Sequence, residues 1–194
     1  MGPSDHYLRN AAFELPGGER VGLRWRTEQW PLKVHLAPPP PEIATNPDAV
    51  FDAVRHGVTD WSGAAGEDVP GFTFIEDPGE ADIPIVWEEA PSGHWYVAHC
   101  VYHLHPMQRR LGVTRILVTT HWRGREVPLQ PLYQAVLHEM GHALGIRGHS
   151  PRPGDIMYEN VGTADGLSAR DRETLRQLYA RPNGKPIVGA RSPD

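Results

Sequence analysis

Three residues, His138, Glu139 and His142, have the types and the spacing needed to hold and use a metal ion. On a helix, residues four positions apart lie on one face with Cβ atoms about 5–6 Å apart, so the two imidazoles could share one small cation. Glu139 would lie about 100° farther round the helix, where its carboxylate can reach a metal-bound water without becoming a ligand. The spacing therefore predicts half of a zinc site, with Glu139 as the general base.

The sequence after this motif offers a third ligand. Gly145 follows His142 by about one helical turn, and a glycine with positive φ there can end the helix and turn the chain back toward the metal. His149 then comes next as a metal-binding side chain. The rest of 137–145 is apolar, so the polar side chains would be buried, and a metal would remove the cost of burying them. Three protein ligands leave a fourth position open for water, which is typical of a catalytic zinc.

Residues 138–158 resemble the metzincin metalloproteases, most closely the matrixins, whose pattern is H-E-x-x-H-x-x-G-x-x-H followed by a Met-turn. Gly-His-Ser-Pro at 148–151 and Asp-Ile-Met-Tyr at 155–158 are similar to the matrixin run from the third ligand to this turn. Residues 167–171 are similar to the start of the family's last helix. The resemblance implies that Met157 forms a hydrophobic floor beneath the histidines without binding the metal.

The third histidine departs from the family pattern by one position. The pattern places it three residues after the glycine, at Gly148, whereas His149 comes one residue later. We expect a one-residue insertion that Gly148 absorbs, because the spacing from His149 onward fits the family. The alternative is that His149 is not a ligand, in which case Asp155 or Glu159 would supply a carboxylate in its place.

The resemblance implies a zinc-dependent endopeptidase that hydrolyses peptide bonds through a zinc-bound water activated by Glu139, with a peptide or protein as its substrate. The substrate would lie extended along an unpaired edge of the sheet and add a strand to it. The alternative is a non-catalytic zinc-binding module for protein interaction with the same fold. The presence of Glu139 favours the enzyme, because metal binding alone does not require a base there.

A second group of histidines lies in the predicted strand at 95–105. On an extended strand, His103 and His105 are roughly 6.6 Å apart on one face and could share a metal, whereas His99 is too far from His103 without a bend. Matrixins also carry a structural zinc and calcium, but this run has no acidic stretch and no nearby aspartate. We therefore expect one catalytic zinc and interpret these histidines as facing solvent or substrate. Cys100 is interpreted as a small buried strand residue.

The order of the predicted elements, together with the resemblance, indicates an α+β fold of the metzincin or zincin-like type. We expect a twisted, mostly parallel sheet of four to five strands with an antiparallel edge strand, two long helices and a C-terminal helix. Sequence patterns predict a hairpin at 10–26, strands at 30–36, 72–75, 81–87, 95–105 and 115–121, and helices at 47–61, 129–144 and 168–179. Ser168 and Asp171 are predicted to cap the last helix. Pro84 is expected to leave one side of its strand unpaired.

The length of 194 residues fits one domain. We expect a single metalloprotease catalytic domain over residues 1–194, with an upper lobe at about 25–145 and a small lower lobe at about 146–182 by the resemblance. Residues 183–194 follow a proline that stops the last helix and are predicted to be a mobile tail.

Composition argues against several other functions. The net charge of −5 gives no reason to expect nucleic acid or an anionic membrane as a partner. No apolar run approaches the roughly 20 residues of a transmembrane helix, and a single cysteine excludes an internal disulfide. We expect a monomer. The first residues lack the basic and apolar regions of a signal peptide, whereas the resemblance implies a secreted or extracytoplasmic protein.

Overall fold

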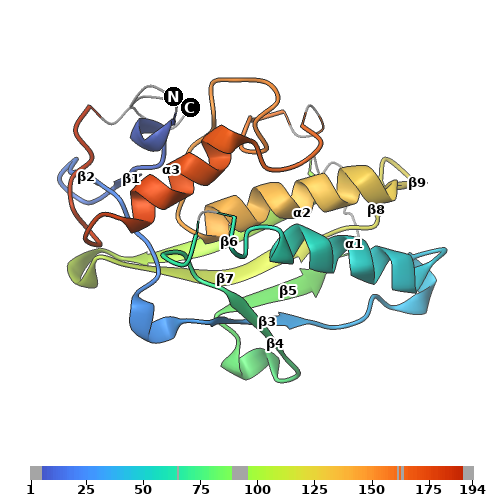
Figure 1. Cartoon of the computed structure of the whole chain (residues 1–194). Helices are drawn as coiled ribbons and strands as arrows, with labels where there is room; N and C mark the ends of the chain where they lie inside the picture. Colours follow the sequence, from blue (N-terminus) through green and yellow to red (C-terminus); the bar gives the residue numbers. More distant parts are fainter. Residues whose placement is uncertain (1–5, 65, 89–95, 161, 163, 190–194) are drawn as a thin grey trace.

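A five-stranded sheet covered on one face by helices α1 (Pro47–Thr59) and α2 (Leu129–Ala143) forms the framework of the molecule (Figure 1). The computed structural model describes residues 6–64, 66–88, 96–160, 162 and 164–189. The sheet strands are β3 (Leu32–Leu36), β4 (Phe72–Ile75), β5 (Ile83–Trp87), β6 (Ala98–His105) and β7 (Arg110–Val118). Two small hairpins, β1 (Phe13–Glu14) with β2 (Arg20–Val21) and β8 (His121–Trp122) with β9 (Arg125–Glu126), and the C-terminal helix α3 (Ala169–Tyr179) complete the α+β fold.

The strand order in the sheet is β4-β3-β5-β7-β6. Neighbouring strands run parallel except β6 and β7, which form an antiparallel pair at one edge. This confirms the predicted mostly parallel sheet with an antiparallel edge strand. β7 begins at Arg110 and not at residue 115, because its first residues pair with 102–105 of β6. Trp95, where the β6 strand was predicted to begin, lies outside the described residues.

β5 is paired on both sides, so the expectation that Pro84 leaves one side of its strand unpaired is wrong for the strand as a whole. Residues 83–85 pair with β3, where Pro84 lies opposite His35, and residues 85–87 pair with β7. The two pairings are therefore staggered along the strand and overlap at Ile85. Proline has no N–H to donate, and it lies in the part of β5 that is in register with β3 alone.

α1 begins with the predicted cap, because the Asn46 side chain accepts a hydrogen bond from a first-turn N–H of the helix.

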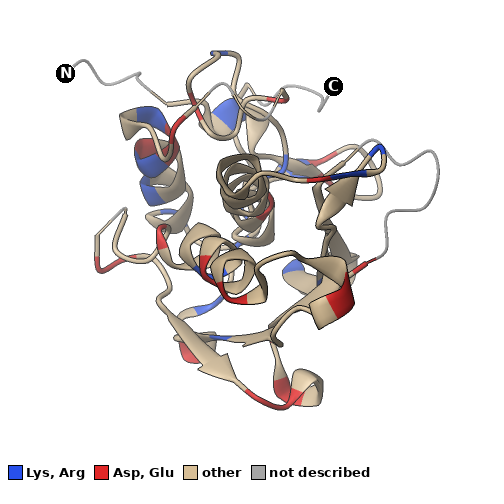
Figure 2. Ribbon diagram, turned by 90° about the vertical axis from the view of Figure 1, so that its right-hand side faces the viewer, with Lys and Arg blue, Asp and Glu red and all other residues tan. Residues whose placement is uncertain are grey.

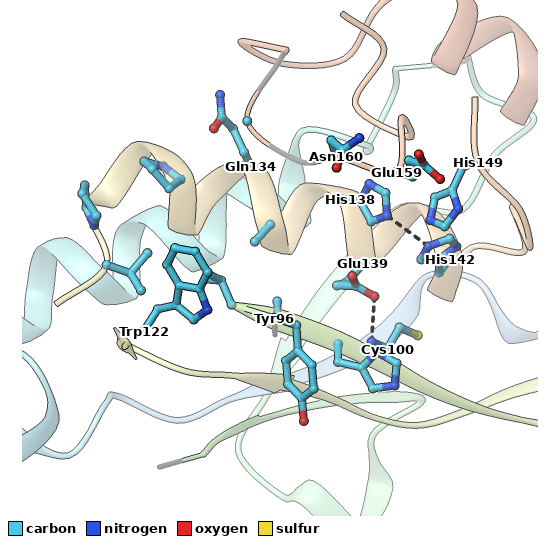
Figure 3. A pocket seen from close by; sticks show the side chains of 18 of the residues that line it. Tyr96, Cys100, Trp122, Gln134, His138, Glu139, His142, His149, Glu159 and Asn160 are labelled. Carbon is cyan, nitrogen blue, oxygen red and sulfur yellow. Dashed lines mark hydrogen bonds between the residues drawn. The ribbon is translucent and has the colours of Figure 1, made fainter. Parts of the chain in front are cut away.

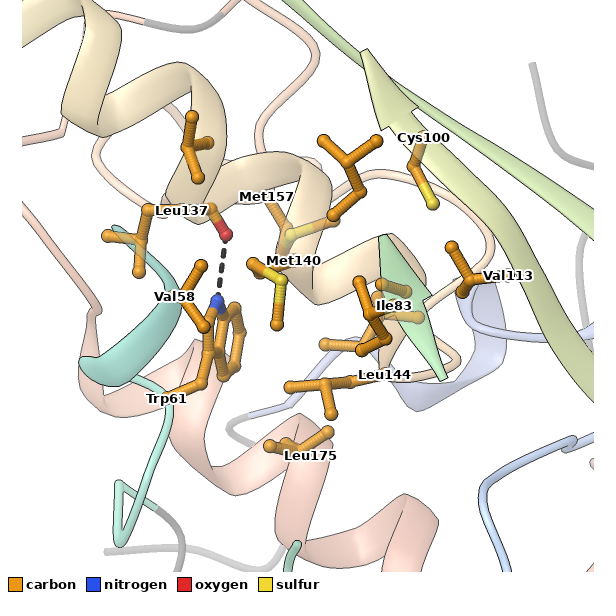
Figure 4. Packing of buried hydrophobic residues seen from close by; sticks show 14 of the residues in the cluster. Val58, Trp61, Ile83, Cys100, Val113, Leu137, Met140, Leu144, Met157 and Leu175 are labelled. Carbon is orange, nitrogen blue, oxygen red and sulfur yellow. Dashed lines mark hydrogen bonds between the residues drawn. The ribbon is translucent and has the colours of Figure 1, made fainter. Parts of the chain in front are cut away.

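The two long helices pack closely because a glycine and a tryptophan of the α1 region meet α2. At Gly57, an added Cβ would lie 3.0 Å from the Tyr133 carbonyl oxygen, so a larger residue would push the helices apart. Trp61 is fully buried and donates its indole N–H to the Leu137 carbonyl at 2.7 Å (Figure 4). These contacts hold α2 against the α1 region. Figure 2 views both helices nearly along their axes.

Residues 183–189 return to the N-terminal hairpin, which corrects the prediction of a mobile tail in this part of the chain. The Ile187 N–H donates to the Arg20 carbonyl at 3.1 Å, and the Ile187 side chain is buried. The segment is ordered because its backbone and its apolar side chain find partners on β2. Residues 190–194 lie outside the described residues.

α3 begins with the predicted capping box. The Ser168 hydroxyl accepts a hydrogen bond from the Asp171 N–H at 3.0 Å, and the Asp171 carboxylate accepts one from the Ser168 N–H at 2.8 Å. Among the helices of the described residues, none combines the length and hydropathy that a membrane span requires.

Candidate metal centre

Three histidine side chains meet at the C-terminal end of α2 (Figure 3). His138 and His142 project from the helix, and His149 projects from the loop that follows it. The ring centroids are 4.8 Å apart for His138 and His142, and 5.2 Å for each pair that includes His149. One possible ligand atom from each residue lies within 4.8 Å of the others. The structure thus brings together the three residues that the sequence predicts as metal ligands.

The hydrogen bonds of two of these rings determine where their lone pairs point. Nδ1 of His138 lies 2.7 Å from the Ile156 carbonyl oxygen, and Nδ1 of His142 lies 2.7 Å from that of Ile146. A carbonyl oxygen only accepts, so both Nδ1 atoms carry the proton and both Nε2 atoms are acceptors. The two Nε2 atoms are 3.1 Å apart. Two nitrogens bound to one tetrahedral zinc are about 3.3–3.4 Å apart, so this donor set fits zinc.

Burial keeps these two imidazoles in the form that binds metals. It lowers the pKa of His138 to about 4, and it lowers the pKa of His142 well below the ordinary value. The hydrogen bonds to the Ile156 and Ile146 carbonyls oppose this effect, and the neighbouring imidazoles add to it. Because only the neutral imidazole is a ligand, protons compete little with a metal for these nitrogens near neutral pH.

Gly145 ends α2 in the conformation expected from its position. Its φ is 110°, in the left-handed region that favours glycine. Its N–H donates to the His142 carbonyl at 3.0 Å, and the Ile146 N–H donates to the Gly141 carbonyl at 3.0 Å, which together form a Schellman motif. An added Cβ would lie 2.3 Å from the Leu23 carbonyl oxygen. The turn therefore needs glycine both for its backbone and for space.

Gly148, in the loop before His149, lies against the N-terminal segment. A Cβ on Gly148 would lie 2.4 Å from the Asn10 carbonyl oxygen, so the N-terminal segment packs directly against this position. The Asn10 side chain also donates a hydrogen bond to the His149 carbonyl at 2.8 Å. Of the alternative ligands, Asp155 is buried and is bonded to two serines and an arginine. In the described chain, neither Asp155 nor Glu159 belongs to the cluster of possible ligands.

Met157 packs against α2 (Figure 4), beside Gly141, the residue before His142. It is fully buried, and a Cβ on Gly141 would lie only 2.2 Å from its sulfur, so glycine provides the space for Met157. The carboxylate of Asp171, at the start of α3, accepts hydrogen bonds from the N–H groups of Ile156 at 2.9 Å and Met157 at 3.4 Å. Because the Ile156 carbonyl is the partner of His138, this turn connects α3 to a candidate ligand.

Glu139 lies in the same cleft, against the edge strand β6. One carboxylate oxygen accepts a hydrogen bond from the Cys100 N–H at 2.7 Å (Figure 3). Burial raises the pKa of Glu139 to about 8, and the hydrogen bond from Cys100 opposes this shift. A group whose pKa lies near the working pH can both accept and return a proton. Glu139 is not part of the cluster of possible ligands. Its carboxylate would therefore be free of the metal, which a general base must be.

The histidines and Glu139 line a cleft of about 1250 Å³ that runs along β6. Residues 96–100 and 102 form one wall, and residues 159, 160 and 162 lie in another. Val161, between them in sequence, lies outside the described residues. β6 is the last strand of the sheet, and its partner there in the described part of the chain is β7. The cleft thus presents a strand edge beside the candidate metal centre.

A comparison with models of known protein families agrees with this arrangement. Residues 24–180 match the model of the matrixin family. The chain belongs to the matrixin family. Matrixins are zinc-dependent metallopeptidases, and their substrates are proteins or peptides. The match begins before β3 and ends after α3, so it includes every residue of the candidate centre, whereas the N-terminal segment with Asn10 precedes it.

His103 and His105 of β6 lie side by side, as the alternation of a strand predicts, with ring centroids 4.7 Å apart. The bulge between Val101 and Tyr102 lies between these two residues and His99. Three or more side chains able to share a metal occur in the described residues only at the cluster on α2. Cys100 is buried in the core, and burial raises the pKa of its thiol, as expected for a strand residue.

Two residues near the centre were missed by sequence reasoning. Asn10 carried no signal, because it contacts the His149 loop only through the fold and precedes the family match. Arg147 lines the cleft and was visible as a charge between the apolar end of α2 and Gly148, next to the predicted third ligand. A cation at this position of the loop could have been singled out.

The lowered pKa of His138 predicts how the stability of the metal-free protein changes with pH. Because the folded-state pKa is about 4 and the ordinary value is 6.5, the unfolded chain binds a proton that the folded protein excludes. The contribution of neutral His138 to the free energy of unfolding is therefore complete above about pH 6.5 and is lost as the pH falls toward 4. Relative to His138→Gln, the wild type should lose on the order of 3 kcal/mol of unfolding free energy over this window. Urea unfolding with a chelator at several pH values measures this difference.

The comparison of wild type with His138→Gln cancels the opposite contribution of Glu139, which both proteins share. His99→Gln, at an exposed position of β6, is the control and should follow the wild type across the pH range. Curves for wild type and His138→Gln that stay parallel from pH 6.5 to 4 would contradict the prediction.

The turn at Gly145 predicts a large cost for a small substitution. Gly145→Ala should reduce the free energy of unfolding by more than about 2 kcal/mol, because the added Cβ meets the Leu23 carbonyl as well as an unfavourable φ. Gly63→Ala is a matched control: Gly63 has a φ of 70°, and nothing lies within 4 Å of its added Cβ. Its cost should be about 1 kcal/mol. Equal losses in denaturant titrations would show that the close approach to Leu23 is unimportant.

Proposed function

We propose that the protein is a zinc-dependent endopeptidase. The observation that carries the proposal is the pair of Nε2 atoms of His138 and His142, 3.1 Å apart, in the same cleft as the buried carboxyl group of Glu139. A site that only bound a metal would gain nothing from a buried carboxyl group outside its ligand set, and burying one is costly. The match to the matrixin family supports the same activity.

The residues of the centre would have different roles in peptide hydrolysis. His138, His142 and His149 would hold the metal. When bound, zinc supplies a Lewis acid that polarises the scissile carbonyl and acidifies a water molecule. Glu139 would accept the proton of the attacking water and return it to the nitrogen of the leaving amine. The Cys100 N–H holds one oxygen of this carboxylate and leaves the other for the proton.

The substrate would bind as an extended peptide beside β6. The outer edge of this strand is next to the cleft, so the N–H and C=O groups of a peptide could continue the ladder of the sheet. Main-chain hydrogen bonds of this kind give affinity without selecting a sequence. Selectivity would come from the side chains that line the cleft.

Glu139→Gln tests the role of the proposed base. The amide cannot accept the proton, so cleavage of casein should fall at least about 100-fold, while the zinc content measured by metal analysis should remain that of the wild type. Glu76→Gln makes the same chemical change at an exposed position outside the cleft and should keep full activity.

Two outcomes would contradict this proposal. Casein cleavage that survives in the zinc-loaded Glu139→Gln variant would exclude Glu139 as the base. A wild-type protein that binds zinc but cleaves neither casein nor gelatin would instead favour a zinc-binding module for protein interaction.

A further inference from the structure

We propose that Arg147 makes this cleft selective for peptides with an acidic side chain close to the scissile bond. The proposal rests on the peptidase function proposed above and names one determinant of its substrate class. Arg147 lies in the loop between Gly145 and His149, and its side chain lines the cleft. It is therefore close to the candidate ligands without being one of them.

The Arg147 guanidinium is held in place by an aromatic ring of the edge strand. Its central carbon lies 5.3 Å from the centroid of the Tyr102 ring. Tyr102 in turn packs edge-on against the buried ring of Phe13, with centroids 5.5 Å apart. A cation that already rests on a fixed ring loses little freedom when a ligand binds, so less of the binding energy is spent on ordering it.

The charge of Arg147 is available to a ligand. Within the described residues, its side chain takes part in no ion pair or hydrogen bond. Three acidic residues line the same cleft, but Glu126 is bonded to Thr45, Glu139 is bonded to Cys100, and Glu159 lies on the wall opposite β6 (Figure 3). None of the three forms an ion pair with Arg147 in the described residues, and the Arg147 guanidinium lies over Tyr102 of β6.

This cation is a local feature of the cleft. The chain carries a net charge of −5, and acidic and basic residues are interspersed over its elements (Figure 2). Two other arginines, Arg123 and Arg125, line the cleft from the β8–β9 hairpin. Arg147 lies two residues from His149, so it is the arginine that can select a substrate position beside the metal centre.

The position of Tyr102 sets the substrate position that Arg147 can reach. Tyr102 is two residues beyond Cys100, whose N–H is bonded to the proposed base. An extended chain advances about 3.3 Å per residue, so a peptide lying along β6 would pass Arg147 within two or three residues of the scissile bond. A guanidinium can bind both oxygens of a carboxylate. An amide or a lysine ammonium in the peptide has no such pair of oxygens.

The test uses zinc-loaded enzyme and fluorogenic peptides that differ only by Glu or Lys at one position. The position is scanned over the three residues on each side of the scissile bond. We expect kcat/KM to favour Glu over Lys by about fivefold at a position on one side of the bond. Arg147→Glu should reverse this preference, and Arg147→Lys should retain part of it.

The ratio of the two rates separates selectivity from damage to the site. A variant that binds zinc less tightly loses both rates equally, so the Glu-to-Lys ratio is unaffected by the fraction of loaded enzyme. Arg125→Glu is the matched control, because it makes the same change of charge in β9, which also lines the cleft. It should leave the ratio at the Arg147-dependent position as in the wild type.

The possible outcomes test this inference separately from the peptidase function on which it rests. If the zinc-loaded wild type cleaves no peptide, the proposed function fails and this inference fails with it. If the wild type cleaves peptides with equal rates for Glu and Lys, or if Arg147→Glu and Arg125→Glu shift the ratio equally, the inference is overturned while the peptidase function stands.

Discussion

The rest of this structure depends on the contact between two imidazole nitrogens, the Nε2 atoms of His138 and His142, which face each other with no proton between them. Each ring of His138 and His142 donates its Nδ1 proton to a backbone carbonyl, which leaves both Nε2 lone pairs directed into one small space. A proton on either Nε2 would relieve the repulsion between the two lone pairs. Burial disfavours this protonation, because it lowers the pKa of His138 to about 4. A divalent cation is the remaining partner, because it satisfies both lone pairs at once.

The surrounding elements keep these nitrogens together by restraining the backbone on both sides of them. Trp61 and Gly57 bring α1 against α2, so the helix that carries two of the histidines cannot move independently. Gly145 then reverses the chain by a backbone conformation and a close approach that other residues cannot adopt. Asp171 holds the turn at Met157 from the other side. These contacts restrain the backbone that carries the candidate ligands, and restrained ligands lose less entropy when a metal binds.

The sequence predicted those features whose causes are local. The spacing of His138 and His142, the caps at Asn46 and Ser168, and the glycine at 145 each act within a few residues, and the structure shows them as expected. The antiparallel edge strand followed from the resemblance to the matrixins.

The errors arose where distant segments decide the outcome. Pro84 is tolerated because the pairing of its strand with β7 begins only at Ile85, which no local pattern reveals. Residues 183–189 are held by β2, and Asn10 reaches the His149 loop, although both contacts join segments far apart in the sequence. Long-range pairing of this kind depends on the complete fold, so propensity and periodicity could not supply it.

The additional residue before His149, relative to the matrixin pattern, connects the candidate metal centre with the selectivity proposed for the cleft. Three residues separate Gly145 from His149, and two of them are committed to backbone contacts: the Ile146 carbonyl binds His142, and Gly148 abuts Asn10. The third, Arg147, has its side chain left to project over β6. The longer loop thus keeps the third histidine beside the other two and places a cation where a substrate would pass. Its support comes from Asn10, which precedes the part of the chain that matches the family, so the segment outside the match helps to define what the matrixin centre can bind.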